Sequence, residues 1–455
     1  MKSNLLMVFS LFFFLLVTAD QILVLRKQKS IKLINVFSLT YGATYGLLLF
    51  TYLFLYKSMG IEVIRIIYTE SDLGSLWYWF TFSVFGYISI QIVYRFAFST
   101  DKTKKAELIQ EKKKEKLSPH SFFCLQLTGI VCLVVGIISF YLWARAYGGI
   151  SEFISVANAV RGGWSDVINP FAFMKHPSKI VLFSSYIFFK LIKEKHKIFL
   201  NSIFMLISLV FSFCYIMAND GRMTMAIYVV ILMFMMLDLF AEQINIGKKA
   251  VAVLIIAFVS IVLILNMDAF TASIRGSEIE ESGDSLAEGL TEELSYIVAA
   301  GQTSVRHWRE PGSRLLLFDD LFSGIFAWLP TSLKPGNFVS IWTFNTNRYL
   351  ENPDVVNTST IPTDYISTSI YDLGVFGCIV FGLFWGLILK KLDQEKKTSR
   401  SPFFEIVYYT LAMSIFRLVN YCSLYDFILG LFNVAVAAVI WKMSAILADL
   451  MHKPR

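Results

Sequence analysis

Charged residues are scarce in this sequence. Of its 455 residues, 16% are Asp, Glu, Lys or Arg, whereas 56% are apolar and 16% are aromatic. Soluble globular domains carry about 25% charged residues, so that class of protein is excluded. The composition predicts an all-α polytopic membrane protein.

Proline and ionisable residues are almost absent from the long apolar runs. Arg417 lies in the outer third of its run, while Asp20 and Asp238 lie near the ends of theirs. Coupled transporters usually carry intramembrane charges and broken helices near the midplane, so that function is disfavoured. Arg417 either extends its side chain to the membrane interface or contacts an anionic ligand.

The cysteines lack the spacing of metal ligands or of a disulfide framework. All five fall in or beside apolar runs, where packing explains them: Cys124, Cys132, Cys214, Cys378 and Cys422. We therefore expect no zinc site and no disulfide.

Apolar runs long enough to cross roughly 30 Å of hydrocarbon predict about eleven transmembrane helices. The run 179–192 is the shortest, and it is counted because omitting it would move two lysine-rich connections to the wrong side of the membrane. The first run continues past Val17-Thr18-Ala19 to Leu25, so we interpret it as an uncleaved span. The runs are 4–25, 33–56, 74–98, 120–144, 179–192, 198–218, 224–241, 250–270, 365–389, 403–421 and 425–446.

These runs divide the chain into three parts. Residues 1–270 hold helices 1–8 with short external connections, residues 271–364 form one large hydrophilic loop, and residues 365–455 hold helices 9–11. The lysine-rich connections, such as 99–118, alternate with lysine-poor ones, and lysine-rich connections stay in the cytoplasm. This places the N-terminus and the 271–364 loop outside and the C-terminus inside.

The basic residues on the two sides differ in kind. Of the 41, the topology places 26 inside, 14 outside and one, Arg417, within a span; arginine accounts for four of the inside set and nine of the outside set. Arginine's planar fork suits bidentate pairing with phosphate or carboxylate. The external arginines therefore bind a phosphate group or pair with the many acidic residues of the loop.

The hydrophilic loop contains two predicted helices. Ser285 and Glu288 have the spacing of a capping box, and leucines then recur at helical intervals, which predicts an amphipathic helix over 285–300. A second helix over 315–329 is too short to span and is expected in the interface or re-entering the bilayer.

His307, between Arg306 and Arg309, is our first candidate for a general base, because a near-neutral pKa suits removal of a hydroxyl proton. A surface histidine without a catalytic role is the alternative. The rival bases are Asp364, Asp220 and Glu310, and the pattern Glu70-Ser71-Asp72 is either an acidic metal-binding pair or a solvated turn.

Several short motifs together resemble the O-antigen and capsular polysaccharide polymerases of the Wzy class. They are Arg145-Ala146-Tyr147-Gly148-Gly149-Ile150 followed by Arg161, the turn Asp220-Gly221-Arg222, Pro362-Thr363-Asp364, and Tyr371-Asp372-Leu373-Gly374-Val375-Phe376-Gly377. The likeness covers most of the chain and rests on topology and on the placement of glycine and arginine.

The resemblance implies an enzyme of the bacterial cytoplasmic membrane that joins undecaprenyl-diphosphate-linked oligosaccharide repeat units on the outer face. Its catalytic candidates are then His307, Asp364 and Asp220, and its diphosphate-binding candidates are Arg161, Arg222, Arg275, Arg306, Arg309 and Arg417. Arginines can stabilise the leaving diphosphate, so we expect neither metal nor cofactor.

The expected partners are membrane lipids, the lipid-linked glycans, a chain-length regulator and a flippase. Nucleic acid is not expected, because the net charge of +7 follows from the lysines of the cytoplasmic connections. The alternatives are an O-antigen ligase or another lipid-linked sugar transferase, and a polysaccharide flippase.

The topology is testable with single cysteines in a cysteine-free background. An impermeant maleimide on intact cells or spheroplasts should label Gly336→Cys in the large loop and leave Lys105→Cys in the 99–118 connection unlabelled, because only the former is expected outside. The reverse pattern would overturn the topology.

Overall fold

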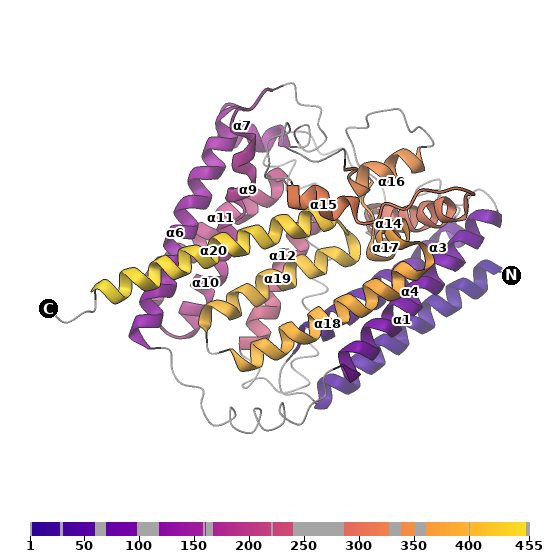
Figure 1. The fold of residues 1–455 in the computed structure, drawn as a ribbon, viewed down its shortest axis with the longest axis horizontal. Helices are drawn as coiled ribbons and strands as arrows, with labels where there is room; N and C mark the ends of the chain where they lie inside the picture. The colour runs from indigo at the N-terminus through magenta and orange to yellow at the C-terminus, as the bar shows by residue number, and fades with distance from the viewer. Residues whose placement is uncertain are drawn as a thin grey trace.

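The structure is a computed structural model that describes eleven stretches of the chain. They are residues 2–27, 31–59, 70–97, 118–157, 160, 167–219, 222–239, 286–326, 338–350, 361–399 and 401–451. Within them every regular element is helical (Figure 1), which confirms the all-α fold class.

Eight of the described helical segments are long and apolar enough to cross a membrane, so the chain is a multi-pass membrane protein. Most of them expose large apolar side chains that suit a lipid environment, for example Leu15 of α1 and Leu206 of α11. The eight are α1 (Lys2–Lys27), α2 (Leu33–Gly42) with α3 (Leu49–Met59), α4 (Glu70–Phe96), α6 (Pro119–Arg145), α11 (Ile198–Asn219), α17 (Tyr365–Leu373) with α18 (Gly377–Thr398), α19 (Pro402–Asn420) and α20 (Leu424–Met451).

The other three expected spans remain predictions. The run 179–192 forms α10 (Val181–Lys193), whose 13 residues rise only about 20 Å along a helix axis. The run 224–241 forms α12 (Arg222–Leu239), and the run 250–270 lies outside the described residues. An exact count of eleven is therefore not established.

Helix α10 nevertheless runs beside α19 for most of its length. Lys190 of α10 lies 2.7 Å from Glu405 in the first turn of α19, whereas Lys179, just before α10, lines the same pocket as Arg417 near the end of α19. The two helices are therefore antiparallel neighbours.

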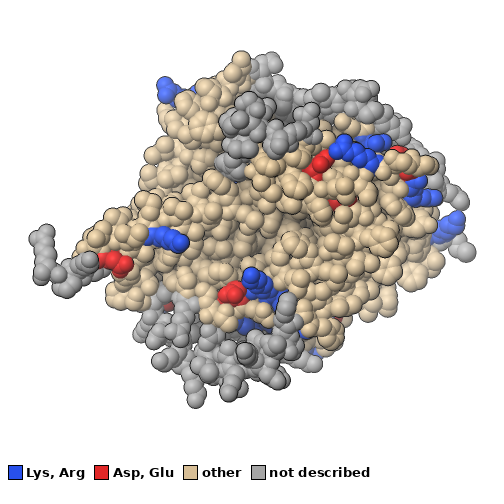
Figure 2. Space-filling model, viewed as in Figure 1, with Lys and Arg blue, Asp and Glu red and all other residues tan. Residues whose placement is uncertain are grey.

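Further helices gather where several long helices end. They are α7 (Ile150–Ser155), the 3-10 turn η2 (Ala172–Met174), α9 (Lys175–Ser178), α14 (Leu286–Arg309), α15 (Asp319–Ile325) and α16 (Ile341–Tyr349). Figure 1 draws α7, α15 and α16 along the upper edge of the bundle, and we call this edge the loop end. The face in Figure 2 is mostly uncharged, with charged side chains in small separate groups.

The first predicted loop helix is longer and more deeply buried than expected. It begins at Leu286, as the capping box indicates, but it continues to Arg309 instead of ending near 300. Its side chains from Ile297 to Val305 are buried on every face, and a Cβ at Gly301 would lie 2.5 Å from the indole of Trp79. The helix as a whole is amphipathic, as predicted, but its predicted end near residue 300 was wrong, because small residues let the second half insert among α4, α16 and α17.

The second predicted loop helix, expected over 315–329, is the short α15. Leu317 and Phe318 have positive φ angles and turn the chain before the helix begins. Asp320 of α15 is fully buried, and its carboxylate accepts hydrogen bonds from the backbone N–H groups of Ile341 (3.3 Å) and Tyr425 (3.0 Å). One side chain thus accepts a hydrogen bond from a backbone N–H group in the first turn of α16 and from another in the first turn of α20.

A break divides the predicted span 365–389. Gly374, with a φ of 64°, ends α17, the 3-10 turn η5 (Gly374–Phe376) follows, and α18 begins at Gly377. A Cβ at Gly377 would lie within 3 Å of the backbone carbonyl group of Ser369, so only glycine fits there. The glycines of this motif therefore have a structural role at the junction of the two helices.

The shared cap predicts a pH dependence of stability. Burial raises the pKa of the Asp320 carboxyl to about 6 from its usual 3.8. Because the unfolded chain loses this proton near pH 4 and the folded protein near pH 6, the protein should lose up to roughly 3 kcal/mol of unfolding free energy as pH rises across that window.

Thermal unfolding in detergent at pH 4–7 checks this. Compared with the wild type, Asp320→Asn should be more strongly destabilised near pH 4.5 than at pH 7, because its amide does not titrate. A difference between the two proteins that stays constant with pH would contradict the assignment.

Candidate functional site

A pocket lies near the loop end between α10, α19 and α20. Its cavity volume is about 30 Å³, and the wider depression around it measures about 550 Å³ when the open solvent is included. Its described lining residues are Lys179, Leu182, Phe183, Tyr186, Thr410, Met413, Ser414, Arg417, Leu418, Tyr421, Ser423, Asp426, Phe427, Gly430 and Asn433. The set combines three charged side chains with polar and apolar ones.

Arg417 and Asp426 form an ion pair in this pocket. The guanidinium Nη2 lies 3.2 Å from the carboxylate Oδ2, and 11% of the Arg417 side chain and 31% of the Asp426 side chain are exposed. A charge this poorly solvated is costly unless it is paired. Asp426 supplies a partner, and its side chain is the more exposed of the two.

The local potential of the pocket is positive. Lys179 and Arg417 oppose Asp426, and Lys175 lies close enough to act on the neighbouring His176. Burial, followed by the charges of Lys175 and Lys179, lowers the pKa of His176 to about 4, so this ring stays neutral near pH 7. Burial, the largest cause, disfavours any charge on the ring; the two lysines add a positive surrounding, and Asp426 acts in the opposite direction.

The start of α20 adds to this potential. Helix α20 has 28 residues, and its N-terminal end, with a partial positive charge, opens at the pocket. The backbone N–H of Asp426 donates to Ser423 Oγ at 3.1 Å, and that of Tyr425 donates to Asp320. The helix start is therefore held at a fixed position beside the ion pair.

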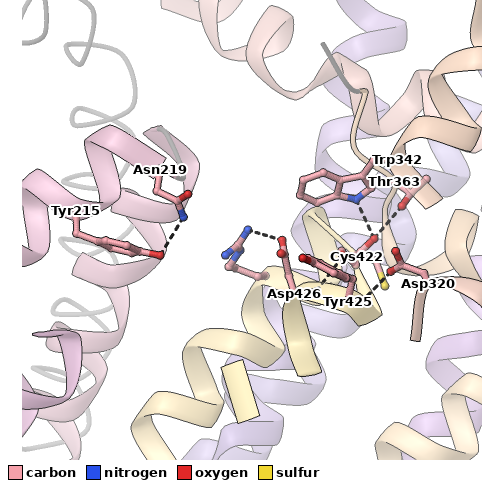
Figure 3. A network of polar contacts seen from close by, with 10 residues as sticks. Tyr215, Asn219, Asp320, Trp342, Thr363, Cys422, Tyr425 and Asp426 are labelled. Atoms are coloured by element: carbon pink, nitrogen blue, oxygen red, sulfur yellow. Dashed lines mark hydrogen bonds and ion pairs between the residues drawn. The ribbon is translucent and has the colours of Figure 1, made fainter. Parts of the chain in front are cut away.

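The turn between α19 and α20 is fixed by residues from the loop (Figure 3). The carbonyl oxygen of Cys422 accepts from Trp342 Nε1 (3.1 Å) and from Thr363 Oγ1 (2.8 Å), and the backbone N–H of Cys422 donates to the Thr363 carbonyl at 2.7 Å. Segments far apart in the sequence thus shape one rim of the pocket.

Apolar side chains from three helices contribute to the lining, beside polar ones such as Thr410 and Asn433. Leu182 and Phe183 come from α10, Met413 and Leu418 from α19, and Phe427 from α20. Gly430 approaches α19 closely, since a Cβ there would lie 3.2 Å from Ser414 Oγ. An anionic group with an apolar chain attached therefore matches both parts of the pocket, because the cations meet the anion and the apolar walls meet the chain.

Of the predicted anion-binding arginines, Arg417 is the one that lines this pocket. Arg306 and Arg309 lie on α14, and the guanidinium of Arg309 lies 5.5 Å from the ring centroid of Tyr78. Arg161 and Arg275 lie outside the described residues, as does Asp220; Arg222 begins α12, but its side chain is not described. Their roles stay predictions.

Two other loop arginines pair with acidic residues, as one of the two readings of the external arginines predicted. Arg314 lies 2.9 Å from Asp319, and Arg348 lies 3.4 Å from Glu310. Both guanidinium groups are well exposed, and such pairs contribute little to stability.

His307 is buried in the folded loop. Its Nε2 lies 2.9 Å from the carbonyl oxygen of Arg314 and donates to it, and its ring packs against Phe344 and Tyr371. Its Nδ1 lies 3.8 Å from Glu310 Oε2, and burial lowers the pKa of the imidazole. The histidine connects α14 to the next segment of the loop, and its catalytic role stays a prediction.

Asp364 is fully buried and caps α17. Its carboxylate accepts from Tyr45 Oη (2.8 Å), from Trp79 Nε1 (3.3 Å), and from the backbone N–H groups of Ile366 and Ser367 and the hydroxyl of Ser367. Tyr45 lies in the π-helical segment η1 (Ala43–Leu48) between α2 and α3. These internal donors give Asp364 a structural role; its proposed action as a base stays a prediction.

Sequence reasoning missed Lys179 and Asp426. Lys179 was counted only as an external charge, and Asp426 only as part of the last apolar run. The signal for Asp426 was its position nine residues after Arg417, across a turn between two spans. Nothing in the sequence indicated that Lys179 would join them, because α10 meets α19 only in the folded bundle.

No group of three or more His, Cys, Asp or Glu side chains suited to a metal ion occurs in the stretches of chain that the structure describes. The side chains of Glu70 and Asp72, the alternative metal pair, lie outside them.

The chain matches no protein-family model, no curated protein sequence and no solved structure.

Proposed function

We propose that this protein is a membrane polymerase that joins undecaprenyl-diphosphate-linked oligosaccharide repeat units into a surface polysaccharide. It acts in the bacterial cytoplasmic membrane, with the loop end on the outer face. The pocket between α10, α19 and α20 receives the lipid diphosphate of the growing chain.

The observation that carries the proposal is that one pocket contains both cationic side chains and apolar walls. Lys179 and Arg417 contribute the positive charge, and the pocket continues between apolar side chains of helices that are suited to a membrane. A soluble phosphate ligand needs no such walls, whereas a prenyl chain gains about 0.8 kcal/mol for each CH₂ group that leaves water.

The proposed reaction also needs charge stabilisation where this pocket provides it. As the glycosyl bond to the diphosphate breaks, negative charge builds up on the leaving oxygen. Donors fixed in a poorly solvated site stabilise that charge more than water does. The guanidinium of Arg417 has five N–H donors in a planar fork, so it can contact a carboxylate and a phosphate at once.

A flippase for the same lipid-linked glycan is the second candidate. The break at Gly374 and the buried carboxylates of Asp364 and Asp372 around α17 are features of transporter helices that the sequence alone did not indicate. A flippase would use the pocket only to bind its cargo and would not extend it.

Deletion of the gene separates the two candidates. A strain without the polymerase should still carry lipid-linked or lipid-A-linked glycan of one repeat unit and should lose the long ladder on a gel of surface polysaccharide. Loss of even the single-repeat glycan would instead support the flippase or the ligase.

Substitutions in the pocket test the site. Arg417→Ala and Lys179→Ala should each lower chain extension by roughly ten- to more than a hundredfold, because a charge-assisted hydrogen bond is worth about 1.5–3 kcal/mol. Arg417→Lys keeps the charge but loses the fork and should be intermediate. The measurement is extension of lipid-linked repeat units by purified protein.

Arg348→Ala is the matched control, because Arg348 also pairs with one carboxylate but lies away from the pocket lining. It should extend chains like the wild type. If the pocket variants are active at normal membrane levels, or inactive only because the protein is lost from the membrane, the diphosphate binds elsewhere.

A further inference from the structure

Asp426 stands out in a pocket proposed to receive a diphosphate. It is the one acidic residue among the described residues that line the pocket, and it lies at the more exposed end of the ion pair with Arg417. A carboxylate repels a phosphate group and so weakens its binding. Its presence needs an explanation other than affinity for the diphosphate.

Pairing with Arg417 explains only part of its position. A carboxylate that served merely to neutralise Arg417 would be most effective where it is as poorly solvated as the guanidinium. Instead, 31% of the Asp426 side chain is exposed, against 11% for Arg417. The carboxylate is thus the more accessible group of the pair, so a second substrate that approaches the bound diphosphate can reach it.

The backbone that carries Asp426 is also held in place. Its backbone N–H donates to Ser423 Oγ, the preceding N–H donates to buried Asp320, and the turn before it is fixed by Trp342 and Thr363. Figure 3 shows these residues converging on the start of α20. A positioned carboxylate can bind a sugar hydroxyl and take its proton, whereas a mobile one does so poorly.

We propose that Asp426 is the catalytic residue that binds the acceptor sugar's hydroxyl and accepts its proton during chain extension. The inference rests on the proposed polymerase function and names the residue that serves the second substrate. Neither His307 nor Asp364 lines this pocket.

The step balances in bonds and protons. The acceptor hydroxyl oxygen forms a bond to the anomeric carbon of the growing chain, and the bond from that carbon to the diphosphate oxygen breaks. The electron pair leaves with the undecaprenyl diphosphate, opposite Lys179 and Arg417. The hydroxyl proton moves to an Asp426 oxygen and passes to the leaving diphosphate or to water as the products separate.

Arg417 contacts the base before substrate binds and the diphosphate afterwards. In the absence of substrate its guanidinium contacts Asp426. When the diphosphate binds, the fork contacts phosphate oxygens, and the Asp426 carboxylate can turn to the hydroxyl of the acceptor. The ion pair thus places the base within reach of the reacting bond and keeps it paired between turnovers.

The test compares Asp426→Asn with the wild type in nanodiscs, measuring chain extension at saturating lipid-linked repeat and binding of undecaprenyl diphosphate separately. Loss of a general base typically costs 10²–10⁴-fold in rate, so Asp426→Asn should extend chains at least about a hundredfold more slowly. It should bind undecaprenyl diphosphate at least as tightly as the wild type, because a negative charge is removed from the site.

Two further variants exclude a purely structural effect. Asp426→Glu keeps a carboxylate and should recover part of the rate, whereas Asp319→Asn, which removes the carboxylate from the surface pair with Arg314, should leave both measurements unchanged.

The outcomes are distinct. Extension by Asp426→Asn within about threefold of the wild type, or a parallel loss of binding and extension, would overturn the role of Asp426 and leave the polymerase function intact. A wild-type protein that neither binds undecaprenyl diphosphate nor extends chains would overturn the proposed function itself, and this inference with it.

Discussion

The structure depends on satisfying the backbone N–H groups of helices that begin inside an apolar bundle. Burial removes these N–H groups from bulk solvent, so a buried helix start is stabilised by an acceptor from the protein. Four buried aspartates provide acceptors. Asp320 serves α16 and α20, Asp364 serves α17, Asp393 accepts from Leu33 and Ile34 at the start of α2, and Asp372 accepts from Phe318 at the start of α15.

These caps connect distant parts of the chain. Asp393 lies in α18, yet it accepts from the start of α2 and from the hydroxyl groups of Tyr94 and Tyr408. Asp320 joins the hydrophilic loop to α20 in the same way. One of the capped helices, α20, carries Asp426, the partner of Arg417. The hydrogen bonds that cap the start of α20 therefore also set the position of the candidate site.

Much of the fold could be predicted from apolar runs alone. Eight of the expected spans correspond to long apolar helices, since a run of about 20 apolar residues has few other stable states. The capping box at Ser285 located the start of α14. Its end could not be predicted, because the residues from Ile297 to Val305 are buried by contacts with other helices although several of them are small or polar.

The candidate site was less predictable for a similar reason. Arg417 was conspicuous as a charge within an apolar run, so it was identified. Asp364 suggested a catalytic acid or base, whereas its contacts show the N-cap of α17; its position directly before the predicted run 365–389 was a signal for that cap. Lys179 and Asp426 meet Arg417 only through the packing of α10 against α19 and α20, which neither periodicity nor spacing encodes.

The arginines differ in how well water solvates them. Arg314 and Arg348 pair with carboxylates at the protein surface, where water competes for both partners. Arg417 pairs with Asp426 in a pocket with apolar walls, where an anion gains more from the same charge. Solvation, more than the number of arginines, therefore decides which of them can hold a diphosphate.

The central claim is that the pocket between α10, α19 and α20 binds the diphosphate head of a prenyl lipid. The most direct measurement is an experimental structure of the protein in nanodiscs with undecaprenyl diphosphate. We expect phosphate oxygens within hydrogen-bond distance of Arg417 and Lys179 and the prenyl chain along Leu182, Phe183 and Met413. A diphosphate found instead beside Arg306 and Arg309 of α14, with the pocket unchanged, would contradict the account.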